Sequence, residues 1–585
     1  MSYSAAANPS TRAEIEALVN QKAWKDLDSL LTERMAFGTA GLRAAMGAGF
    51  SRMNDLTVIQ ATQGLCQYML KVNPDVSKQG VVVGHDHRHH SLSFAQLTAA
   101  VFISKGIKVY YYKNLTHTPL VPYGVKKLKA AAGIMITASH NPKQDNGYKV
   151  YWSNACQIIP PHDTGIADMI LQHLQPWTWD YELCQTSPLS SDPSEQLAVE
   201  YFEDVKKLSY YHDTNSTTDL TFCYTAMHGV GWPFAERSFK AFGHKPFVIT
   251  PEQVEPNPDF PTVEYPNPEE GKGALTLAMK AADAANARII LANDPDADRL
   301  AIAEKLSSTD WHIYSGNEIG SILGCWVWEN YQKSSKKSDK GAAMLASTVS
   351  SKMLEVVAKK EGFYFEDTLT GFKWLGNRAI TLSEQGYDVV FAFEEAIGFM
   401  VGDIVHDKDG VSALSVVAEL AVELSRKGMR VYDYLQQLYQ RYGFFVSNNS
   451  YFICHEAATI QSIFDKIRYG AKRAPAPDHS YSYPTHLGGF KVTSVRDLTV
   501  GYDTSTSDHI PKLPSSASSQ MITFRLENDC VITLRTSGTE PKIKYYSELS
   551  GSSKESATAS LDAIIADMTD KLLEPQANKL GYRKP

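Results

Sequence analysis

The sequence of 585 residues lacks the long apolar segments that would place it in a membrane. No apolar run reaches the roughly 18 residues that a transmembrane helix needs, so we expect none. The N-terminal segment is rich in Ser and Ala but has no apolar core like that of a secretory signal peptide. Arg12 is followed by Glu14 and Glu16, which disfavours a mitochondrial presequence. We therefore expect a cytoplasmic protein.

The sequence also has few cysteines and no excess of basic residues over acidic ones. The seven cysteines are widely spaced and form no C-x-x-C pair, which is typical of reduced thiols in a cytosolic protein. The 57 Lys and Arg are outnumbered by 65 Asp and Glu, for a formal net charge of -8. This balance argues against a protein that binds nucleic acid through bulk charge, although it leaves room for a local basic pocket.

The chain has an ordinary globular composition and the length of several domains. Hydrophobic residues make up 43% and charged residues 21%. At about 150 residues per domain, the length predicts about four domains. The first three quarters alternate short apolar runs with helical patterns, which predicts α/β domains with parallel strands. The expected strands are 80–84, 108–112, 131–137, 287–292, 341–347 and 388–393, and the expected helices are 93–104, 273–286 and 352–360.

The last quarter of the chain has a different pattern. Several strand-like segments precede one helix, which predicts an α+β domain. The strands are expected at 447–454, 490–497, 521–526 and 531–534, and the helix at 557–573. Ser/Pro-rich or charged segments predict loops at 187–194, 333–340, 474–484 and 504–519.

A loop with a candidate nucleophile follows the strand expected at 131–137. In the segment TASHNP (137–142), Ser139 could act as a nucleophile with His140 beside it. The carboxyl ends of parallel strands are where α/β sheets bind ligands, although Asn-Pro also favours an ordinary turn. The segment is not the G-x-S-x-G nucleophile elbow, so a serine-hydrolase triad is not supported.

A second loop places three aspartates at alternate positions. Asp294, Asp296 and Asp298 would point the same way if the segment DPDADR were extended. Three carboxylates so close repel one another unless a cation binds, and a hard divalent ion such as Mg²⁺ is the natural partner. An EF-hand is excluded because Arg299 and Lys305 stand where its Gly and Glu are needed. The alternative is a solvated acidic loop.

Two further loops indicate recognition of a sugar and of a phosphate. Glu394 and Glu395 follow an expected strand, and a carboxylate accepts hydrogen bonds from hydroxyls, although a glutamate pair is also common at a solvated helix start. The segment RTSGTEPK (535–542) combines hydroxyls, a glycine and Arg535, which could hold an anion or form an ordinary turn. No Walker A motif occurs.

The histidine-rich segment HDHRHH (85–90) looks like a metal site. A closed zinc site needs separated ligands that converge in space, so six contiguous residues do not favour one.

A nucleophile, a metal loop, a hydroxyl-binding loop and a phosphate loop are the parts that phosphoryl transfer to or from a sugar requires. The chain resembles the α-D-phosphohexomutase superfamily in TASHNP, DPDADR, FEEAIG (393–398) and RTSGTEPK, and in FGTAGLR at 37–43, which occur in family order. FGTAGLR, TGFKW (370–374) and EEAIG are most similar to the type-2 phosphoglucomutase branch, which includes phosphopentomutases and glucose-1,6-bisphosphate synthases.

This resemblance implies four domains around a central cleft. Three similar α/β domains with mixed sheets would be followed by a C-terminal α+β domain that resembles the TATA-box-binding protein. The implied domains are 1–212 with the phosphoserine loop, 213–322 with the metal loop, 323–445 with the sugar loop and 446–585 with the phosphate loop.

The resemblance also implies roles for individual residues. Ser139 would carry a phosphoryl group and, with Asp294, Asp296 and Asp298, would hold one Mg²⁺ per chain. The implied catalytic residues are Ser139, His140, Lys149 and Arg43, with the general base left open. The implied substrate-binding residues are Arg299, Thr370, Gly371, Lys373, Glu394 and Glu395, and the implied phosphate-binding residues are Arg535, Thr536, Ser537, Gly538 and Thr539. Asp86 and Arg88 align with a family loop that shapes the cleft.

The implied reaction is that of a phosphosugar mutase. It would interconvert 1-phosphate and 5- or 6-phosphate esters through a phosphoserine enzyme and a sugar bisphosphate, which also serves as activator. Ala396 replaces a Ser that many members have, so pentose and hexose substrates both stay open. A glucose-1,6-bisphosphate synthase using 1,3-bisphosphoglycerate and an inactive sugar-phosphate-binding protein are the alternatives. We expect small sugar phosphates as partners, no nucleic acid or membrane, and a monomer.

Overall fold

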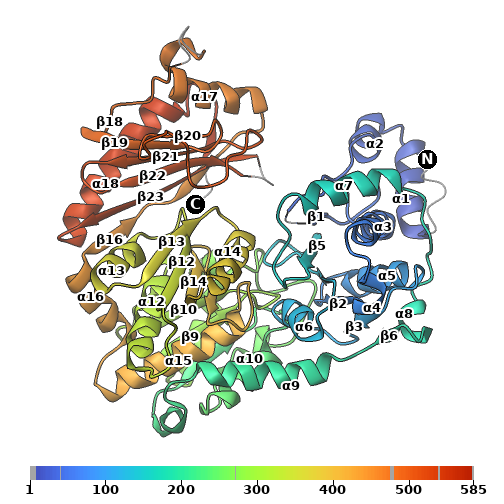
Figure 1. Ribbon diagram of the computed structural model, residues 1–585, viewed down its shortest axis with the longest axis horizontal. Coiled ribbons are helices and arrows are strands. Elements are labelled where there is room, and N and C mark those ends of the chain that lie inside the picture. Colours follow the sequence, from blue (N-terminus) through green and yellow to red (C-terminus); the bar gives the residue numbers. More distant parts are fainter. Residues whose placement is uncertain (1–7, 40, 271, 475–479, 538–540, 583–585) are drawn as a thin grey trace. The chain divides into compact units, whose positions relative to one another are not determined.

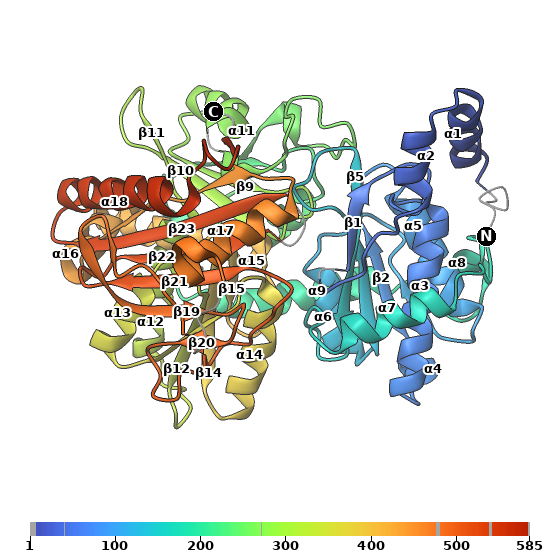
Figure 2. The same ribbon diagram turned by 90° about the horizontal axis from the view of Figure 1, so that it is seen from above.

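The computed structural model describes residues 8–39, 41–270, 272–474, 480–537 and 541–582. They form two compact units (Figures 1 and 2). The first comprises Met1–Leu345 and Gly371–Tyr432, and the second comprises Ala346–Thr370 and Asp433–Pro585. None of the described helices combines the length and hydropathy of a membrane-spanning segment.

The first sheet of the first unit has the strand order β1-β5-β4-β2-β3-β6. β2, β3, β4 and β6 are parallel, whereas β1 and β5 are antiparallel to their neighbours. Every residue of β2 and β4 is buried, as expected of central strands covered on both faces. The strands are β1 (Leu42–Ala45), β2 (Val81–His85), β3 (Val109–Tyr111), β4 (Ala132–Ile136), β5 (Asp145–Trp152) and β6 (Ser190–Ser191).

Helices cover both faces of this sheet. Figure 2 shows α3 and α5 on one side of it and α6 and α9 on the other. α3 begins with a capping box between Asn54 and Thr57, and its Gly64 packs so closely against Ile170 of α7 that a Cβ would overlap that side chain. The helices are α1 (Pro9–Asn20), α2 (Trp24–Leu31), α3 (Asp55–Val72), α4 (Val76–Gln79), α5 (Ser91–Ile103), α6 (Leu120–Leu128), α7 (His162–Gln172), α8 (Leu183–Thr186) and α9 (Ser194–Val205).

Two further sheets belong wholly or mainly to the first unit. The second has the order β11-β10-β9-β7-β8, in which β7, β8 and β9 are parallel and β10 and β11 are antiparallel. In the third, β12, β14 and β15 follow one another, and the division between the units falls inside β12. The strands are β7 (Phe222–Thr225), β8 (Val248–Ile249), β9 (Ile289–Asn293), β10 (Leu300–Lys305), β11 (Trp311–Ile313), β12 (Ala342–Ser347), β14 (Asp388–Glu394) and β15 (Gly398–Val401). Their helices are α10 (Trp232–Ala241), α11 (Lys272–Ala284), α12 (Gly316–Lys333), α14 (Phe372–Glu384) and α15 (Gly410–Arg426).

The three sheets share one local feature. In each, a strand returns through a short loop into an antiparallel neighbour, and the loop is one of the segments singled out in the sequence: β4 to β5, β9 to β10, and β14 to β15. Each loop holds one residue other than glycine with a positive φ, namely Ser139 (53°), Ala297 (55°) and Ile397 (51°). Residues with a Cβ rarely adopt this conformation, so contacts around the loops must hold it.

The second unit is built on an antiparallel sheet with the order β18-β19-β21-β22-β23-β17-β24, to which β16 and β20 add. One hydrophobic core joins this sheet to α17 and α18, so both helices cover the same face. The strands are β16 (Phe444–Ser447), β17 (Ser450–Ile453), β18 (His486–Leu487), β19 (Phe490–Asp497), β20 (Tyr502–Asp503), β21 (Met521–Leu526), β22 (Val531–Thr536), β23 (Lys542–Gly551) and β24 (Gly581–Tyr582). α17 (Ala457–Tyr469), α18 (Lys554–Met568), α13 (Met353–Glu361) and β13 (Tyr364–Thr368) also belong to this unit, and α16 (Val431–Tyr442) begins at the end of the first.

The predicted fold class is confirmed: α/β layers with mixed sheets are followed by an α+β segment. The strands and helices expected in the first three quarters lie within about two residues of those observed. The alternation of elements did not predict the antiparallel strands β5, β10 and β15. The four domain boundaries stay a prediction.

Three details of the prediction are wrong. The single strand expected at 447–454 is two strands, because Asn448 and Asn449 bond through backbone and side chain to Ser547 of β23 and interrupt the ladder. The helix expected at 557–573 ends at Met568 and continues as a π-helical turn, Thr569–Leu573. The loop expected at 187–194 contains β6.

Candidate active site

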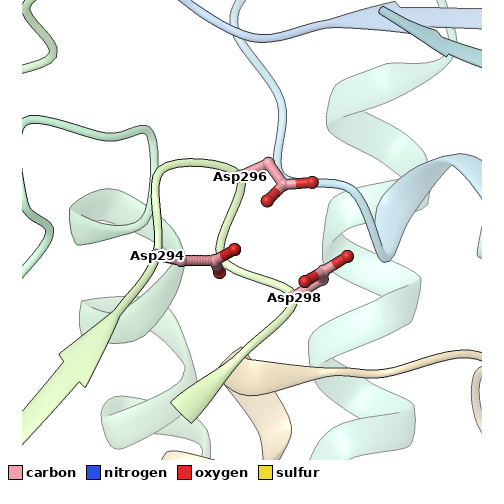
Figure 3. Close-up of side chains that lie close together, drawn as sticks. All are labelled: Asp294, Asp296 and Asp298. Carbon is pink, nitrogen blue, oxygen red and sulfur yellow. The ribbon is translucent and has the colours of Figure 1, made fainter. Parts of the chain in front are cut away.

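Three aspartates converge in the loop between β9 and β10 (Figure 3). Asp294, Asp296 and Asp298 are fully buried, and an oxygen of each carboxylate lies within 4.8 Å of the other two. The loop is not extended, so the alternate spacing of the aspartates is not what aligns them. It curls at Ala297, whose φ is 55°, and the curl brings the carboxylates together.

Basic side chains surround the three aspartates. Lys149 Nζ lies 2.6 Å from Asp296 Oδ2 and 2.9 Å from Asp298 Oδ2. Lys408 Nζ lies 3.4 Å from Asp298 Oδ2, and Arg299 Nε lies 3.9 Å from oxygens of Asp294 and Asp298. The sequence reasoning missed Lys408. The charged run 406–409 directly before a helix was the signal that could have found it.

These partners give the three carboxylates different pKa values. Burial, together with Asp296 and Asp298, raises the pKa of Asp294 well above its ordinary value. Burial also opposes ionisation of the other two, but Lys149 outweighs it and lowers the pKa of Asp296 and Asp298. Burial would lower the pKa of Lys149 in turn, yet the two carboxylates raise it. Asp296, Asp298 and Lys149 are therefore charged at neutral pH.

The donor set fits a hard cation. Oδ1 of Asp296 and Oδ1 of Asp298 are buried and accept no hydrogen bond, whereas buried carboxylate oxygens are normally satisfied. Oxygen ligands of this kind are what divalent cations such as Mg²⁺ prefer. The three aspartates could therefore hold a metal ion.

Ser139 lies beside these aspartates. It follows β4, is 2% exposed, and donates a hydrogen bond from Oγ to Asp294 Oδ2 at 2.9 Å. His140 Nδ1 lies 3.2 Å from the same Oγ. Removal from solvent, reinforced by Arg299 and Arg43, lowers the pKa of His140 well below its ordinary value, so its ring is neutral. The fold thus joins two loops that the sequence identified separately.

A loop that the sequence reasoning did not single out also contacts the aspartates. Thr118, just before α6, donates from Oγ1 to Asp296 Oδ2 at 2.5 Å and from its backbone N–H to the Asp296 carbonyl at 2.9 Å. A lone threonine such as Thr118 carries no recognisable sequence signal.

Asp407 contacts Lys408 and was not predicted either. It accepts hydrogen bonds from Tyr151 and Gln157 and lies 3.2 Å from Lys408 Nζ.

The predicted sugar-binding residues of the first unit form their own contacts. Glu394 Oε1 accepts a hydrogen bond from the Gly371 N–H at 2.5 Å. Burial, followed by the charge of Glu395, raises the pKa of Glu394 to about 7. Lys373 Nζ donates to Thr39 Oγ1. Arg43, a predicted catalytic residue, is exposed and donates to Asn141 Oδ1 at 3.2 Å.

The predicted phosphate-binding residues lie in the second unit. Arg535 donates to Thr370 Oγ1, so these two predicted site residues are in contact. Thr536 ends β22, and the Ser537 N–H donates to the Lys542 carbonyl at 3.0 Å. Gly538 and Thr539 lie outside the described residues.

The histidine-rich segment 85–90 contributes packing and one arginine. The His85 Nδ1 lies 2.9 Å from the Asp86 carbonyl, and the His87 ring meets the Phe260 ring edge-on. Burial lowers the pKa of His87 to about 4, so it is a neutral ring in a packed setting. Arg88 turns toward the Ser139 loop.

Comparison with known proteins gives family matches over most of the chain. Residues 34–176, 199–307 and 315–442 match the models described as phosphoglucomutase/phosphomannomutase alpha/beta/alpha domains I, II and III.

Several relatives match over nearly their whole length. The phosphopentomutase of Mus musculus is 49% identical over 98% of this chain and 94% of its own. The glucose 1,6-bisphosphate synthase of Homo sapiens is 48% identical over the same shares. The phosphoribomutase of Saccharomyces cerevisiae is 43% identical over 94% of this chain and 92% of its own. Among solved structures, the parafusin (phosphoglucomutase) of Paramecium has a TM-score of 0.64 at 19% identity, covering 93% of this chain and 96% of its own.

Proposed function

The chain belongs to the phosphoglucomutase/phosphomannomutase family, and on that premise we propose that it is a phosphosugar mutase. It interconverts the 1-phosphate and the 5- or 6-phosphate esters of pentoses and hexoses. The relatives named phosphopentomutase and phosphoribomutase support pentose phosphates, ribose phosphates among them, as substrates.

The observation that carries the proposal is the position of the Ser139 hydroxyl among the three aspartates. Its Oγ lies 2.9 Å from Asp294 Oδ2 and 3.2 Å from Nδ1 of the neutral His140. One Mg²⁺ held by Asp294, Asp296, Asp298 and the phosphorylated Ser139 would supply positive charge that stabilises the transferring phosphoryl group. Burying three carboxylates beside a serine costs free energy, which is not expected of an ordinary surface loop.

The reaction exchanges one ester bond for another. The Ser139 O–P bond breaks, a new O–P bond forms to a sugar hydroxyl, and the proton of that hydroxyl leaves while Oγ gains one. The bisphosphate turns round and returns its other phosphoryl group to Ser139. His140, neutral and 3.2 Å from Oγ, is placed to hold the Oγ proton, and the charged Lys149 neutralises the aspartates.

The remaining predicted site residues bind the parts of the substrate that do not react. We assign Glu394 and Glu395 to hydrogen bonds from sugar hydroxyls, and Arg299, Thr370, Gly371 and Lys373 to other contacts with the substrate. Arg535, Thr536, Ser537, Gly538 and Thr539 hold the second phosphate. A sugar bisphosphate activates the enzyme by phosphorylating Ser139, and a cytoplasmic monomer is part of the proposal.

A second function is favoured by the relatives named glucose 1,6-bisphosphate synthase. It would use 1,3-bisphosphoglycerate to phosphorylate Ser139 and would release the bisphosphate. Steady-state assays with each donor, a trace of sugar bisphosphate or 1,3-bisphosphoglycerate, separate the two. Side-by-side kcat/KM values for ribose 1-phosphate and glucose 1-phosphate measure the substrate preference. The mutase predicts many turnovers to the isomer without 1,3-bisphosphoglycerate. Accumulation of bisphosphate only when that donor is present would favour the synthase.

A further inference from the structure

One buried guanidinium binds four backbone carbonyls of the loop that carries Ser139. Arg88 Nη1 donates to the carbonyls of Pro142 at 2.9 Å and Asp145 at 3.3 Å. Its Nη2 donates to the carbonyl of Asn141 at 2.6 Å and to that of Ser139 itself. Every contact is to backbone, so Arg88 fixes the path of the loop and does not touch the reacting atoms.

Asp86 and Phe260 in turn hold the Arg88 guanidinium in place. Asp86 Oδ2 lies 3.4 Å from Arg88 Nε, and Asp86 Oδ1 accepts hydrogen bonds from the Arg88 N–H at 2.9 Å and from Ser91 Oγ at 2.6 Å. The Phe260 ring covers the guanidinium, 5.1 Å from its centroid to the central carbon. Arg88 is 3% exposed and Asp86 1% exposed. The ion pair with Asp86 offsets part of the cost of burying this charge, and the four hydrogen bonds of Nη1 and Nη2 fix the orientation of the planar guanidinium.

The loop needs such a support because of the conformation of Ser139. Its φ of 53° lies in the left-handed region that residues with a Cβ rarely adopt. This conformation directs Oγ to Asp294 and leaves the Ser139 carbonyl facing Arg88. A lysine could offer the charge but not the planar fork that reaches four acceptors.

We propose that Arg88 is a positioning residue that holds Ser139 in this left-handed conformation and so sets the direction of Oγ for phosphoryl transfer. The inference rests on the proposed function, since it assigns a role within the same reaction. A displacement of about 1 Å from the reactive geometry can lower a rate about 100-fold.

The test is Arg88→Lys. The single-turnover rate of transfer from phosphorylated Ser139 to ribose 1-phosphate should fall about 100-fold. The KM for ribose 1-phosphate and the Kd for Mn²⁺ of the dephosphorylated protein should stay within about twofold, because the aspartates are held by other contacts. The matched control is Arg468→Lys. Arg468 is 2% exposed and hydrogen-bonded to Asp497 and Gln520 in the second unit, so it reports the effect of losing a buried guanidinium alone.

Three outcomes would overturn the proposal. The first is an Arg88→Lys variant that transfers at the wild-type rate. The second is a loss of rate no larger than that of Arg468→Lys. The third is a loss of rate that follows a loss of Mn²⁺ binding. If Arg88→Lys does not fold, Asp86→Asn decides: it keeps the fork and removes its counter-charge, so a slower transfer supports the proposal and an unchanged rate contradicts it. A wild-type protein that never carries phosphate on Ser139 would instead refute the proposed function.

Discussion

Thr118→Val should weaken metal binding without touching any metal ligand. The Thr118 hydroxyl donates to Asp296 Oδ2 at 2.5 Å, and both residues are buried. Valine has nearly the same shape but no donor, so the packing around α6 is retained. The backbone hydrogen bond from Thr118 to the Asp296 carbonyl is also retained. The change therefore removes one charge-assisted hydrogen bond from a carboxylate that has to keep a fixed orientation.

The expected size of the effect follows from the strength of that bond. A hydrogen bond to a charged group contributes about 1.5–3 kcal/mol. At about 1.4 kcal/mol per factor of ten, its loss corresponds to roughly 10- to 150-fold in affinity. Removing groups that orient metal ligands costs about 10- to 100-fold in metal affinity, which is the same range. We expect the Kd for Mn²⁺ to rise about 10- to 100-fold.

The assay is a calorimetric titration of the dephosphorylated protein with Mn²⁺. Thr118→Ser keeps the hydroxyl and should bind Mn²⁺ like the wild type. Thr523→Val removes a buried hydroxyl in the second unit, where Thr523 Oγ1 lies 2.9 Å from Thr533 Oγ1, and should also bind normally. Equal Mn²⁺ affinity in Thr118→Val and the wild type would refute the reasoning.

Three further changes have defined outcomes. The KM for the sugar phosphate should rise as the pH falls through about 7, because Glu394 becomes protonated there. Burial and the charge of Glu395 raise the pKa of Glu394 to about 7. KM measured over a pH series should lose this change in Glu394→Gln. Gly229→Ala should lower Mn²⁺ affinity, because its Cβ would lie 2.5 Å from the Pro295 carbonyl oxygen and displace the aspartate loop; unchanged binding would contradict this. Arg468→Met leaves Asp497 buried without its cation. Unfolding in guanidinium chloride should therefore show a free energy of unfolding about 3–5 kcal/mol lower than that of the wild type. A decrease of less than about 1 kcal/mol would contradict a stabilising ion pair.

Residue types and spacing located the loops of the candidate site but not their convergence. The order of strands and helices predicted that each loop follows a strand, and the carboxyl ends of such strands are where ligands bind. The contact of Ser139 with Asp294 joins residues 155 positions apart, which local patterns do not specify. The spacing of the aspartates would align their carboxylates in an extended segment, but the loop is a turn at Ala297, whose positive φ cannot be predicted from its residue type.

The supporting residues were harder to predict than the reactive ones. Thr118 acts through one hydroxyl, and Lys408 through proximity to Asp298, and neither stands in a pattern that only one function explains. The resemblance singled out Arg88 as part of a loop that shapes the cleft, but it could not predict the contacts of Arg88, which are with backbone carbonyls that every residue has. Such roles depend on tertiary contacts and emerge only from the fold.

The most direct test of the account is the phosphorylation state of Ser139 during turnover. The protein is incubated with a sugar bisphosphate and Mg²⁺, and peptide mass spectrometry then locates the phosphate. We expect one phosphoryl group on Ser139. It should pass to added ribose 1-phosphate and be replaced from the resulting bisphosphate as ribose 5-phosphate forms, so that Ser139 is phosphorylated again after each turnover. Ser139→Ala should show neither phosphorylation nor turnover. Turnover by Ser139→Ala at the wild-type rate, or a wild type that isomerises the sugar phosphate with Ser139 unmodified, would contradict the account.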